Sequence, residues 1–294
     1  MKKAIAHLSR KTTLDITNIN TLNNLFKFKE WDSLLAYENY FARYCILFEL
    51  LNEEQRKLIL ELTKNYLYFP NEEYQKHFYS LLKKVVKDYK LKCEKIFITT
   101  LLVPVDESNE FREIKSPDNL LYLTTGAFFK RNIDFNGIEF VIKERIDLLP
   151  DKIEDNWMVL LIDDFIGTGE TAISAISYLR RIKEVEKTNI KVLSLVSLKE
   201  GVQEISKKGI EVITGITLNK AISEYYISPE KEEKIKIMIT IENLIKGLKP
   251  NFKFGYLGSE ALVTLIKTPD NTFPIFWKDF DNGAETIEAP FQRD

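Results

Sequence analysis

Apolar and polar positions follow two different patterns along this chain. In the first part, apolar residues recur at spacings of three and four, for example between Trp31 and Tyr40, and this is the period of an amphipathic helix. Asn52 and Asn71 each precede two glutamates and a nearby glutamine, an arrangement typical of a helix start. Helices are therefore predicted near residues 53–66 and 71–89.

The pattern changes at Lys95. Residues 96–103 are rich in β-branched side chains and stop at Pro104, which has no N–H to donate to a sheet, so a buried strand is expected there. Residues 104–117 are polar and acidic, and this irregular stretch is long enough to be a functional loop. Residues 137–142 are expected to form a further short strand.

Strands and helices then alternate regularly. Strands are expected at 158–162, 191–198 and 210–217, and helices at 170–184, 201–208 and 229–247. Such alternation predicts parallel pairing with right-handed crossovers. The expected fold class is α/β: a parallel sheet of about five strands with helices on both faces, preceded by an N-terminal helical region. Sheets of this kind bind ligands beyond the carboxyl ends of their strands.

Three regions are predicted from these patterns. Residues 1–92 form the N-terminal helical region, 93–228 the α/β core, and 229–294 a C-terminal helix and tail that packs on the core or on a partner. Aromatic residues of the helical region are expected to pack in a core or interface, not to stack on nucleic-acid bases. They include Phe41, Tyr44, Phe48, Tyr66, Phe78 and Tyr79.

Composition narrows the class of protein. With 45% hydrophobic and 29% charged residues, the chain is expected to fold throughout. Its 42 basic and 44 acidic residues give a net charge of −2, so general attraction to nucleic acid is not expected. No apolar stretch approaches the roughly 20 residues of a membrane helix. The first 13 residues lack the apolar segment of a secretory signal, so a cytoplasmic location is expected.

Cysteine and histidine are scarce. Cys45 and Cys93 both lie in or beside apolar stretches and are expected to be buried small hydrophobes. With only His7 and His77 available, a structural zinc site or a serine–histidine triad has almost nothing to be built from. No protein-held metal site is predicted.

The strongest chemical signal follows the apolar strand 159–162. Asp163 and Asp164 come next, then two apolar residues, then a tight loop that opens directly into an apolar helix. The loop residues are Gly167, Thr168, Gly169, Glu170 and Thr171. Its glycines allow close backbone approach, and the free amides and threonine hydroxyls suit an anion such as phosphate. The two carboxylates can accept hydrogen bonds from neighbouring hydroxyls, such as those of a ribose ring.

Two other interpretations of this segment remain open. Residues 167–172 also satisfy the glycine pattern of dinucleotide-binding folds, although there the acidic residue comes about twenty residues later and not before the loop. In the other interpretation, Asp163 and Asp164 are structural and cap neighbouring turns.

The order of apolar strand, two acids, two apolar residues and a Thr-Gly-x-Thr loop resembles the phosphoribosyl-diphosphate signature of type I phosphoribosyltransferases. The resemblance implies that Asp163 and Asp164 contact the ribose hydroxyls, that the loop holds the 5-phosphate, and that Mg²⁺ binds through the diphosphate of the ligand. Gly167 stands where a threonine is frequent in that family. Residues 198–212 also resemble orotate phosphoribosyltransferases, so the similarity covers about 95–218.

The expected diphosphate site departs from the pattern of this family. Active type I enzymes bind diphosphate with a loop after an earlier strand and with basic residues, but here that strand is followed by Asp106, Glu107, Glu110 and Glu113. Lys115, as a catalytic residue, and Ser116 are the best candidates for this role, followed by Lys130 and Arg131. Two functions remain open: an enzyme acting at C1 of a ribose 5-phosphate donor, and a non-catalytic sensor of phosphoribosyl diphosphate or a nucleotide.

A second resemblance concerns the helical front and the tail 268–277. They are similar to phosphoribosyltransferase-like proteins of bacterial conflict systems, including some retrons. This implies an antiviral defence effector, with a retron reverse transcriptase and its DNA, a winged-helix protein, or identical chains as partners. Trp31, Phe276 and Trp277 are the candidate interface anchors, although packing inside the chain explains the same residues.

Overall fold

The computed structural model describes residues 13–103, 116–281 and 286–293. The chain divides into two compact units. Residues 69–219 form what we call the sheet unit, and residues 1–68 together with 220–294 form the split unit.

These units divide the chain differently from the three regions expected from the sequence. Helix α5 (Asn71–Tyr89), which the sequence analysis assigned to the helical region, belongs to the sheet unit. The segments before residue 69 and after residue 219 fold together in one unit, although they are far apart in the sequence.

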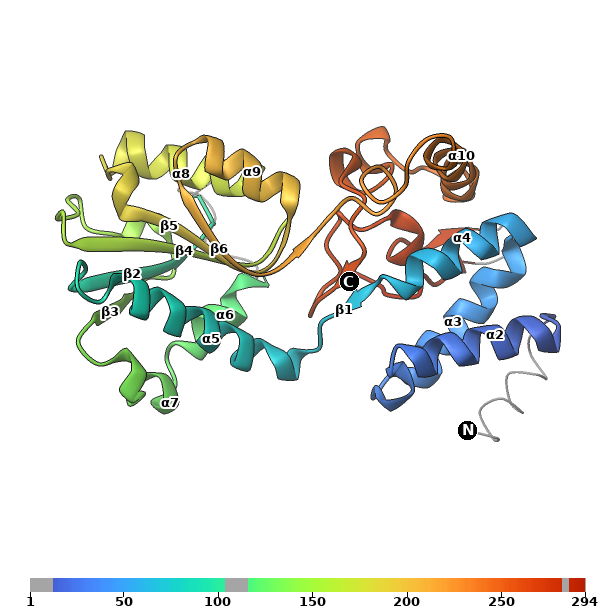
Figure 1. The fold of residues 1–294 in the computed structure, drawn as a ribbon, viewed down its shortest axis with the longest axis horizontal. Coiled ribbons are helices and arrows are strands. Elements are labelled where there is room, and N and C mark those ends of the chain that lie inside the picture. Colours follow the sequence, from blue (N-terminus) through green and yellow to red (C-terminus); the bar gives the residue numbers. More distant parts are fainter. Residues whose placement is uncertain (1–12, 104–115, 282–285, 294) are drawn as a thin grey trace. The chain divides into compact units, whose positions relative to one another are not determined.

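The sheet unit is built on five strands in the spatial order β3-β2-β4-β5-β6, and each neighbouring pair is parallel (Figure 1). The strands are β2 (Lys95–Thr100), β3 (Glu139–Ile142), β4 (Trp157–Ile166), β5 (Ile190–Leu198) and β6 (Glu211–Leu218). The predicted α/β fold with a parallel sheet of about five strands is confirmed.

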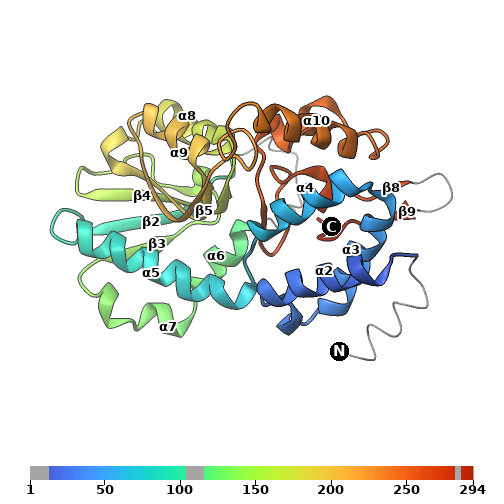
Figure 2. The same cartoon turned by 45° about the vertical axis from the view of Figure 1, so that its right-hand side comes forward.

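Helices cover both faces of this sheet. Besides α5 they are α6 (Pro117–Leu123), α7 (Ala127–Lys130), α8 (Glu170–Ile182) and α9 (Lys199–Lys207), with short 3₁₀ turns at 133–135, 146–148 and 187–189. Figures 1 and 2 show α8 and α9 on one face and α5 and α6 on the other. The apolar side of α8, including Ala172, Ala175 and Leu179, packs in one core with Val159 and Leu161 of β4.

Strand β4 is longer than the sequence predicted. The expected strand ended at Ile162, with the two acids beyond it, but the observed strand continues to Ile166 and contains both acids. The reason is the neighbouring strand β5, which extends alongside and pairs Asp163 with Ser194 and Ile166 with Ser197. The expectation that the acids follow the strand was therefore wrong.

The split unit is mainly helical. Its elements are α2 (Ile16–Phe28), α3 (Tyr37–Leu50), α4 (Glu53–Lys64), α10 (Glu230–Glu242), the parallel pair β1 (Leu67–Tyr68) and β7 (Val263–Thr264), the antiparallel pair β8 (Phe280–Asp281) and β9 (Thr286–Ile287), and 3₁₀ turns at 31–33, 250–252, 256–258 and 274–276.

An aromatic core holds the two segments of the split unit together. The ring of Trp31 meets that of Phe291 edge-on at 5.3 Å, and the rings of Tyr66 and Phe276 lie 4.9 Å apart. These side chains are buried, as are Phe41, Tyr44 and Phe48. Aromatic residues of the helical region therefore pack in a core, as the sequence predicted.

The two predicted helix caps have different outcomes. Asn52 forms a capping box with Gln55, in which each side chain accepts from the other residue's backbone N–H, as expected. Asn71 is the first residue of α5, and the cap position belongs to Pro70, whose extended backbone (ψ 154°) starts the helix one residue earlier. The prediction that Asn71 is the cap was wrong.

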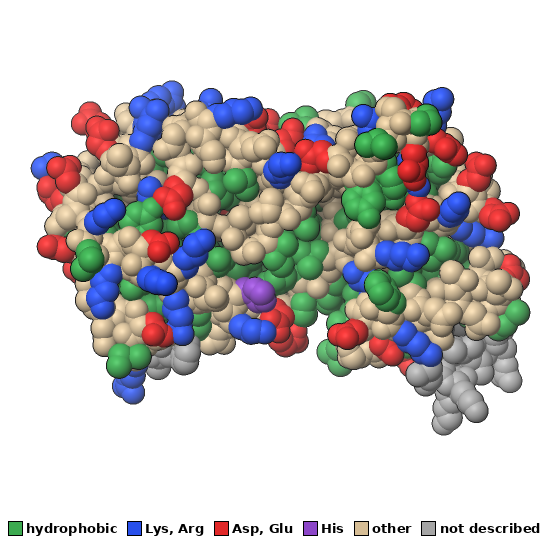
Figure 3. All heavy atoms as spheres, viewed as in Figure 1, with side chains coloured by type: hydrophobic (Ala, Val, Ile, Leu, Met, Phe, Trp, Pro, Cys, Tyr) green, Lys and Arg blue, Asp and Glu red, His purple; other side chains and the backbone are tan. Residues whose placement is uncertain are grey.

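The surface and the helix lengths give two further observations. Among the described residues, no helix is both long and apolar enough to cross a membrane. On the face shown in Figure 3, basic and acidic side chains are interspersed, in keeping with the net charge of −2.

Candidate functional site

The two acids lie near the carboxyl end of β4, the central strand of the sheet. Asp164 is only 3% exposed, whereas Asp163 is partly exposed. The backbone N–H of Asp164 donates to Oδ1 of Asp163 at 2.8 Å, which fixes one oxygen of the outer carboxylate. The edge where β4 ends is where an open parallel sheet binds its ligands.

Two side-chain hydroxyls hold the buried acid. The Tyr74 hydroxyl, on α5, donates to Oδ2 of Asp164 at 3.0 Å. The Ser116 hydroxyl, directly before α6, donates to Oδ1 at 2.9 Å. Asp164 is therefore fixed through both oxygens by groups from two different helical segments.

The charge state of the acid pair is perturbed. Burial and the neighbouring carboxylate of Asp164 raise the pKa of Asp163 well above its ordinary value. Burial also raises the pKa of Asp164, against the hydrogen bonds from Ser116 and Tyr74, which lower it. Two close carboxylates in a poorly solvated position favour one negative charge over two. The pair is thus suited to a ligand that brings hydroxyl donors or positive charge.

The glycine loop follows at once. Gly169 has a left-handed backbone (φ +87°), and α8 begins at the next residue, Glu170. The loop lies directly against the start of α9, because a Cβ on Gly201 would lie 2.2 Å from the carbonyl oxygen of Gly167. A Cβ on Gly169 would in turn lie 3.0 Å from the carbonyl oxygen of Gly201. Glycines at these positions let two backbone segments meet without side chains between them.

The first turn of α8 completes the site. Its N–H groups have no partner within the helix, and the positive end of the helix dipole lies there. Thr168 is half-buried in the loop, and Glu170 and Thr171 are exposed in the first turn. An anion can therefore reach the amides and the threonine hydroxyls from solvent.

The structure brings several of the predicted site residues together. Asp163 and Asp164 lie four and three residues before Gly167, the first residue of the loop, and Ser116 contacts Asp164 from another part of the chain. Lys115 lies outside the described residues. Lys130 and Arg131, the second choice for the diphosphate site, are exposed at the end of α7.

Tyr74 is a site residue that the sequence analysis did not identify. It lies 90 positions before Asp164 and belongs to an aromatic helix whose residues were expected only to pack. The sequence also contains a sign of polar residues at this edge of the sheet that the sequence analysis did not use. Thr99 and Thr100 interrupt an apolar strand at its carboxyl end. Their hydroxyls are buried, and in the described parts of the chain they have no hydrogen-bond partner.

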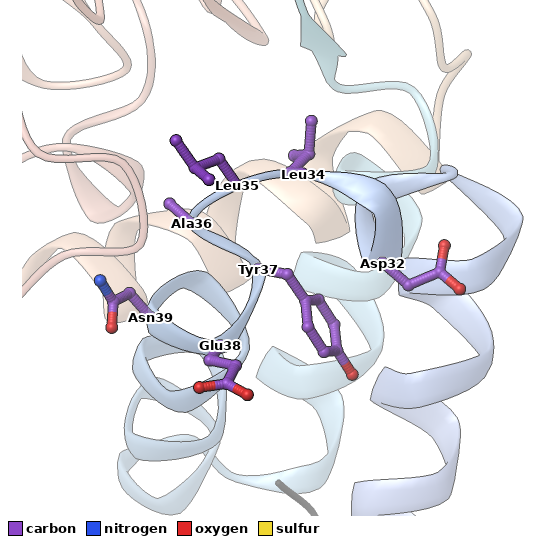
Figure 4. Close-up of a pocket in the computed structure, with 7 residues that line it drawn as sticks. All are labelled: Asp32, Leu34, Leu35, Ala36, Tyr37, Glu38 and Asn39. Carbon is purple, nitrogen blue, oxygen red and sulfur yellow. The ribbon is translucent and has the colours of Figure 1, made fainter. Parts of the chain in front are cut away.

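A separate surface pocket lies in the split unit (Figure 4). Its volume is about 370 Å³, and it is lined by Asp32, Leu34, Leu35, Ala36, Tyr37, Glu38 and Asn39. None of the residues of the phosphate motif lies in it.

The described residues contain no group of three or more histidine, cysteine, aspartate or glutamate side chains placed to hold a metal ion. Both cysteines are free and buried, as predicted, and burial raises the pKa of the Cys45 thiol to about 12. A thiol with so high a pKa is not a reactive nucleophile near neutral pH.

Solved structures with some similarity to this chain include phosphoribosyltransferases. The hypoxanthine-guanine enzyme of Schistosoma mansoni in complex with IMP matches with 18% identity and a TM-score of 0.34, over 51% of this chain and 66% of that enzyme. Orotate phosphoribosyltransferase of Aeropyrum pernix matches with 15% identity and a TM-score of 0.29, over 50% of this chain and 71% of that one. The orotate enzyme of Mycobacterium tuberculosis with 5-phospho-α-D-ribosyl 1-diphosphate matches with 12% identity and a TM-score of 0.30, over 57% and 81%.

A comparison with curated proteins finds no match. The family model described as PRTase-CE matches residues 37–293, which include the acid pair, the glycine loop and most of the split unit. This match extends over most of the chain and agrees with the resemblance carried by the strand, the acids and the loop. The chain belongs to the PRTase-CE family, a family of the phosphoribosyltransferase type.

Proposed function

We propose that this protein binds a ribose 5-phosphate group and acts at its C1 atom, with phosphoribosyl diphosphate or a nucleotide as the donor. The observation that carries the proposal is the acid pair at the end of β4, followed within three residues by a glycine loop that opens α8. Membership of the PRTase-CE family supports it.

In this proposal the loop binds the 5-phosphate. Backbone amides of residues 167–171 and the hydroxyls of Thr168 and Thr171 donate to the phosphate oxygens. The left-handed Gly169 turns the chain so that α8 starts directly at the phosphate, and the dipole of this helix favours the negative charge. Glu170 is exposed and belongs to the loop as a backbone donor.

The acid pair binds the ribose. A carboxylate oxygen has two lone pairs, so Asp164 can accept a ribose hydroxyl while it keeps its bonds from Tyr74 and Ser116. Asp163 is more exposed than Asp164. Its Oδ1 accepts the backbone N–H of Asp164, and its second carboxylate oxygen remains for the sugar. The pair therefore orients the sugar through its vicinal hydroxyls.

The chemistry at C1 is a substitution. The bond between C1 and the leaving group breaks, at an oxygen of the diphosphate or at a ring nitrogen of the base, and the leaving group takes the electron pair. A lone pair of the acceptor forms the new bond to C1, and the acceptor then loses a proton. Positive charge develops on the ribose in between, and the negative charge of the acid pair stabilises it.

The site can accommodate Mg²⁺ that binds together with the ligand. Mg²⁺ prefers oxygen donors and is usually held by one or two carboxylates and by substrate phosphates. Asp163 and Asp164 offer carboxylate oxygens of this kind. When bound, the ion would neutralise the charge of the diphosphate. Lys115 and Ser116 are the proposed residues of this chain on the diphosphate side.

A sensor that binds without turnover is the second candidate. The observation in its favour is the acidic sequence after β2, with Asp106, Glu107, Glu110 and Glu113, where an active enzyme needs groups that attract diphosphate.

One experiment separates the two. The protein is incubated with phosphoribosyl diphosphate, Mg²⁺ and a panel of bases and nucleotides, alone and with co-encoded partners, and products are identified by mass spectrometry. Release of diphosphate with a new C1 adduct supports the enzyme. Binding without any product supports the sensor, and absence of binding contradicts both. The Asp164→Asn variant serves as the control for activity from a contaminant.

We also propose a role as an antiviral defence effector in the cytoplasm, held by identical chains, by a retron reverse transcriptase with its DNA, or by a winged-helix protein. This follows from the resemblance of the helical front and tail. Trp31 and Phe276 are buried within the split unit, so Trp277, which is half-buried, is the remaining anchor to test. Co-purification of co-encoded proteins with the wild-type chain and with Trp277→Ala tests it; equal recovery would contradict the anchor.

A further inference from the structure

We propose that Tyr74 is a positioning residue of the ribose site: its hydroxyl orients Asp164 toward the sugar, so that helix α5 takes part in ribose recognition. The inference rests on the proposed function, because it concerns how the same acid pair recognises its ligand. The phosphoribosyl-diphosphate motif itself contains only β4, the loop and α8.

The contact is well defined. The Tyr74 hydroxyl lies 3.0 Å from Oδ2 of Asp164, and the two side chains are 2% and 3% exposed. The ring of Tyr74 is held edge-on by Phe69 at 5.5 Å, and Phe69 is in turn edge-on to His77 at 5.1 Å. A tyrosine has only two side-chain torsions, so a ring packed in this way fixes the position of its hydroxyl.

The second donor to Asp164, Ser116, shows why the Tyr74 hydroxyl affects the orientation of this carboxylate. Ser116 holds Oδ1 of Asp164 while Tyr74 holds Oδ2, so the plane of the carboxylate is fixed from both ends. If the Tyr74 hydroxyl is removed, one buried oxygen loses its donor, and rotation about the terminal torsion of Asp164 is the easiest way to regain one. The lone pairs that face the ribose would then turn away.

A purely structural role makes a different prediction. If the hydroxyl only satisfies a buried charge, its loss should lower the stability of the sheet unit and affect all ligands alike. A positioning role should instead affect ligands with a full set of ribose hydroxyls. Inorganic phosphate, which needs only the loop and α8, should bind as before.

The chain offers a matched control on the same helix. Tyr79 is also on α5 and is 6% exposed, and its hydroxyl donates to the carbonyl oxygen of Leu123 at 2.8 Å. Tyr79→Phe removes one buried hydroxyl from α5, as Tyr74→Phe does, but it leaves the hydrogen bonds from Tyr74 and Ser116 to Asp164 intact.

The experiment is calorimetric titration of wild type, Tyr74→Phe and Tyr79→Phe with ribose 5-phosphate, 2-deoxyribose 5-phosphate and inorganic phosphate. We expect Tyr74→Phe to bind ribose 5-phosphate roughly tenfold more weakly, the loss typical of one hydrogen bond to a charged group. Its preference for ribose over 2-deoxyribose should shrink, and its affinity for phosphate should stay that of wild type. Tyr79→Phe should resemble wild type with all three ligands.

A double-mutant cycle with Asp164→Asn completes the test. If Tyr74 acts through Asp164, the double variant should bind ribose 5-phosphate no more weakly than Asp164→Asn alone. The inference is overturned by wild-type affinity in Tyr74→Phe, by equal weakening of all three ligands, by additive effects in the cycle, or by a Tyr74→Phe chain that does not fold. Wild type that binds phosphate but not ribose 5-phosphate, or an Asp164→Asn variant that keeps full affinity, would instead refute the proposed ribose site itself.

Discussion

Asp164 in the sheet unit and Glu260 in the split unit are both buried carboxylates with hydrogen bonds to both oxygens, but their donors differ. Glu260 accepts the backbone N–H groups of Ile222 and Ser223 at 2.8 and 2.7 Å on one oxygen and the Ser223 hydroxyl on the other. Asp164 accepts two side-chain hydroxyls from α5 and from the start of α6.

The difference shows why burial and hydrogen bonding alone do not make a ligand site. The donors to Glu260 come from two adjacent residues, so the carboxylate ties the chain at 222–223 to the loop at 260. Glu260 itself has a left-handed backbone (φ +50°), as do Phe254 and Leu257 nearby in the sequence, so this loop is fixed in an unusual shape. Asp164 has a second carboxylate beside it, at the edge where parallel sheets bind ligands.

The largest expected effect is on stability in the split unit. Glu260→Ala removes three hydrogen bonds to a carboxylate and leaves the buried N–H of Ile222 and the half-buried N–H of Ser223 without their acceptor. We expect the free energy of unfolding of that unit to fall by roughly 3–5 kcal/mol. Urea unfolding followed by circular dichroism measures this.

The control for this change is Glu260→Gln, which keeps the side-chain shape and one acceptor oxygen, and which should lose less stability than the alanine variant. Folded protein should still bind ribose 5-phosphate with wild-type affinity in both variants. An alanine variant as stable as wild type would remove the structural role assigned to Glu260.

The next largest expected effect is a pH dependence of the stability of the split unit, caused by Glu242 at the end of α10. Burial raises the pKa of Glu242 to about 7, against the N–H of Phe254 and the charge of Lys253, while Glu260 adds to the rise. A carboxyl group with a raised pKa stabilises the fold below its unfolded pKa, and this stabilisation is lost as the pH rises through the folded pKa. The split unit should thus lose stability between about pH 5 and pH 8, by at most about 3 kcal/mol.

Thermal unfolding of wild type and Glu242→Gln over this pH range tests the assignment. The glutamine keeps the shape of the side chain and cannot ionise, so the variant should show a much flatter dependence and should be the more stable protein at pH 8. Equal slopes for the two proteins would rule out Glu242 as the titrating group.

The sheet unit was the more predictable part of the fold. Its β-branched strands, alternating with amphipathic helices, have only one common arrangement, and the five parallel strands follow from it. The split unit was not predictable, because its core joins Trp31 to Phe291 and Tyr66 to Phe276. Contacts over such separations leave no periodic signal in the sequence.

The same limit applies to the site. Asp163, Asp164 and the loop could be identified because they lie in one continuous segment in which spacing carries the chemistry. Tyr74 could not, since only folding brings a residue of α5 to the end of β4. The predicted length of β4 was also wrong. Two aspartates are poor strand formers by themselves, and pairing with β5 keeps them in the sheet.

A change at the acid pair should act on binding and not on stability, which is the reverse of Glu260→Ala. Asp164→Asn keeps the size of the side chain and should weaken ribose 5-phosphate binding more than tenfold, or roughly 1.5–3 kcal/mol. Thr171→Val should weaken binding through the phosphate. Calorimetric titration and thermal melting measure the two quantities side by side. Unchanged affinity in either variant would contradict the role given to that residue.

The smallest effect is expected at Gly201, which supports the loop without contributing a side chain. The Cβ of Gly201→Ala would lie 2.2 Å from the carbonyl oxygen of Gly167, so the backbone of the loop or of α9 has to shift. We expect about 1–2 kcal/mol of lost stability, as for other overpacked positions, and weaker binding of both inorganic phosphate and ribose 5-phosphate. This result distinguishes Gly201→Ala from Tyr74→Phe, which should keep the wild-type affinity for phosphate.

Gly126→Ala is the matched control, since its Cβ would meet only the carbonyl oxygen of Leu123 at 3.8 Å, an ordinary contact. If Gly201→Ala binds phosphate as tightly as Gly126→Ala does, the close approach of α9 does not shape the loop.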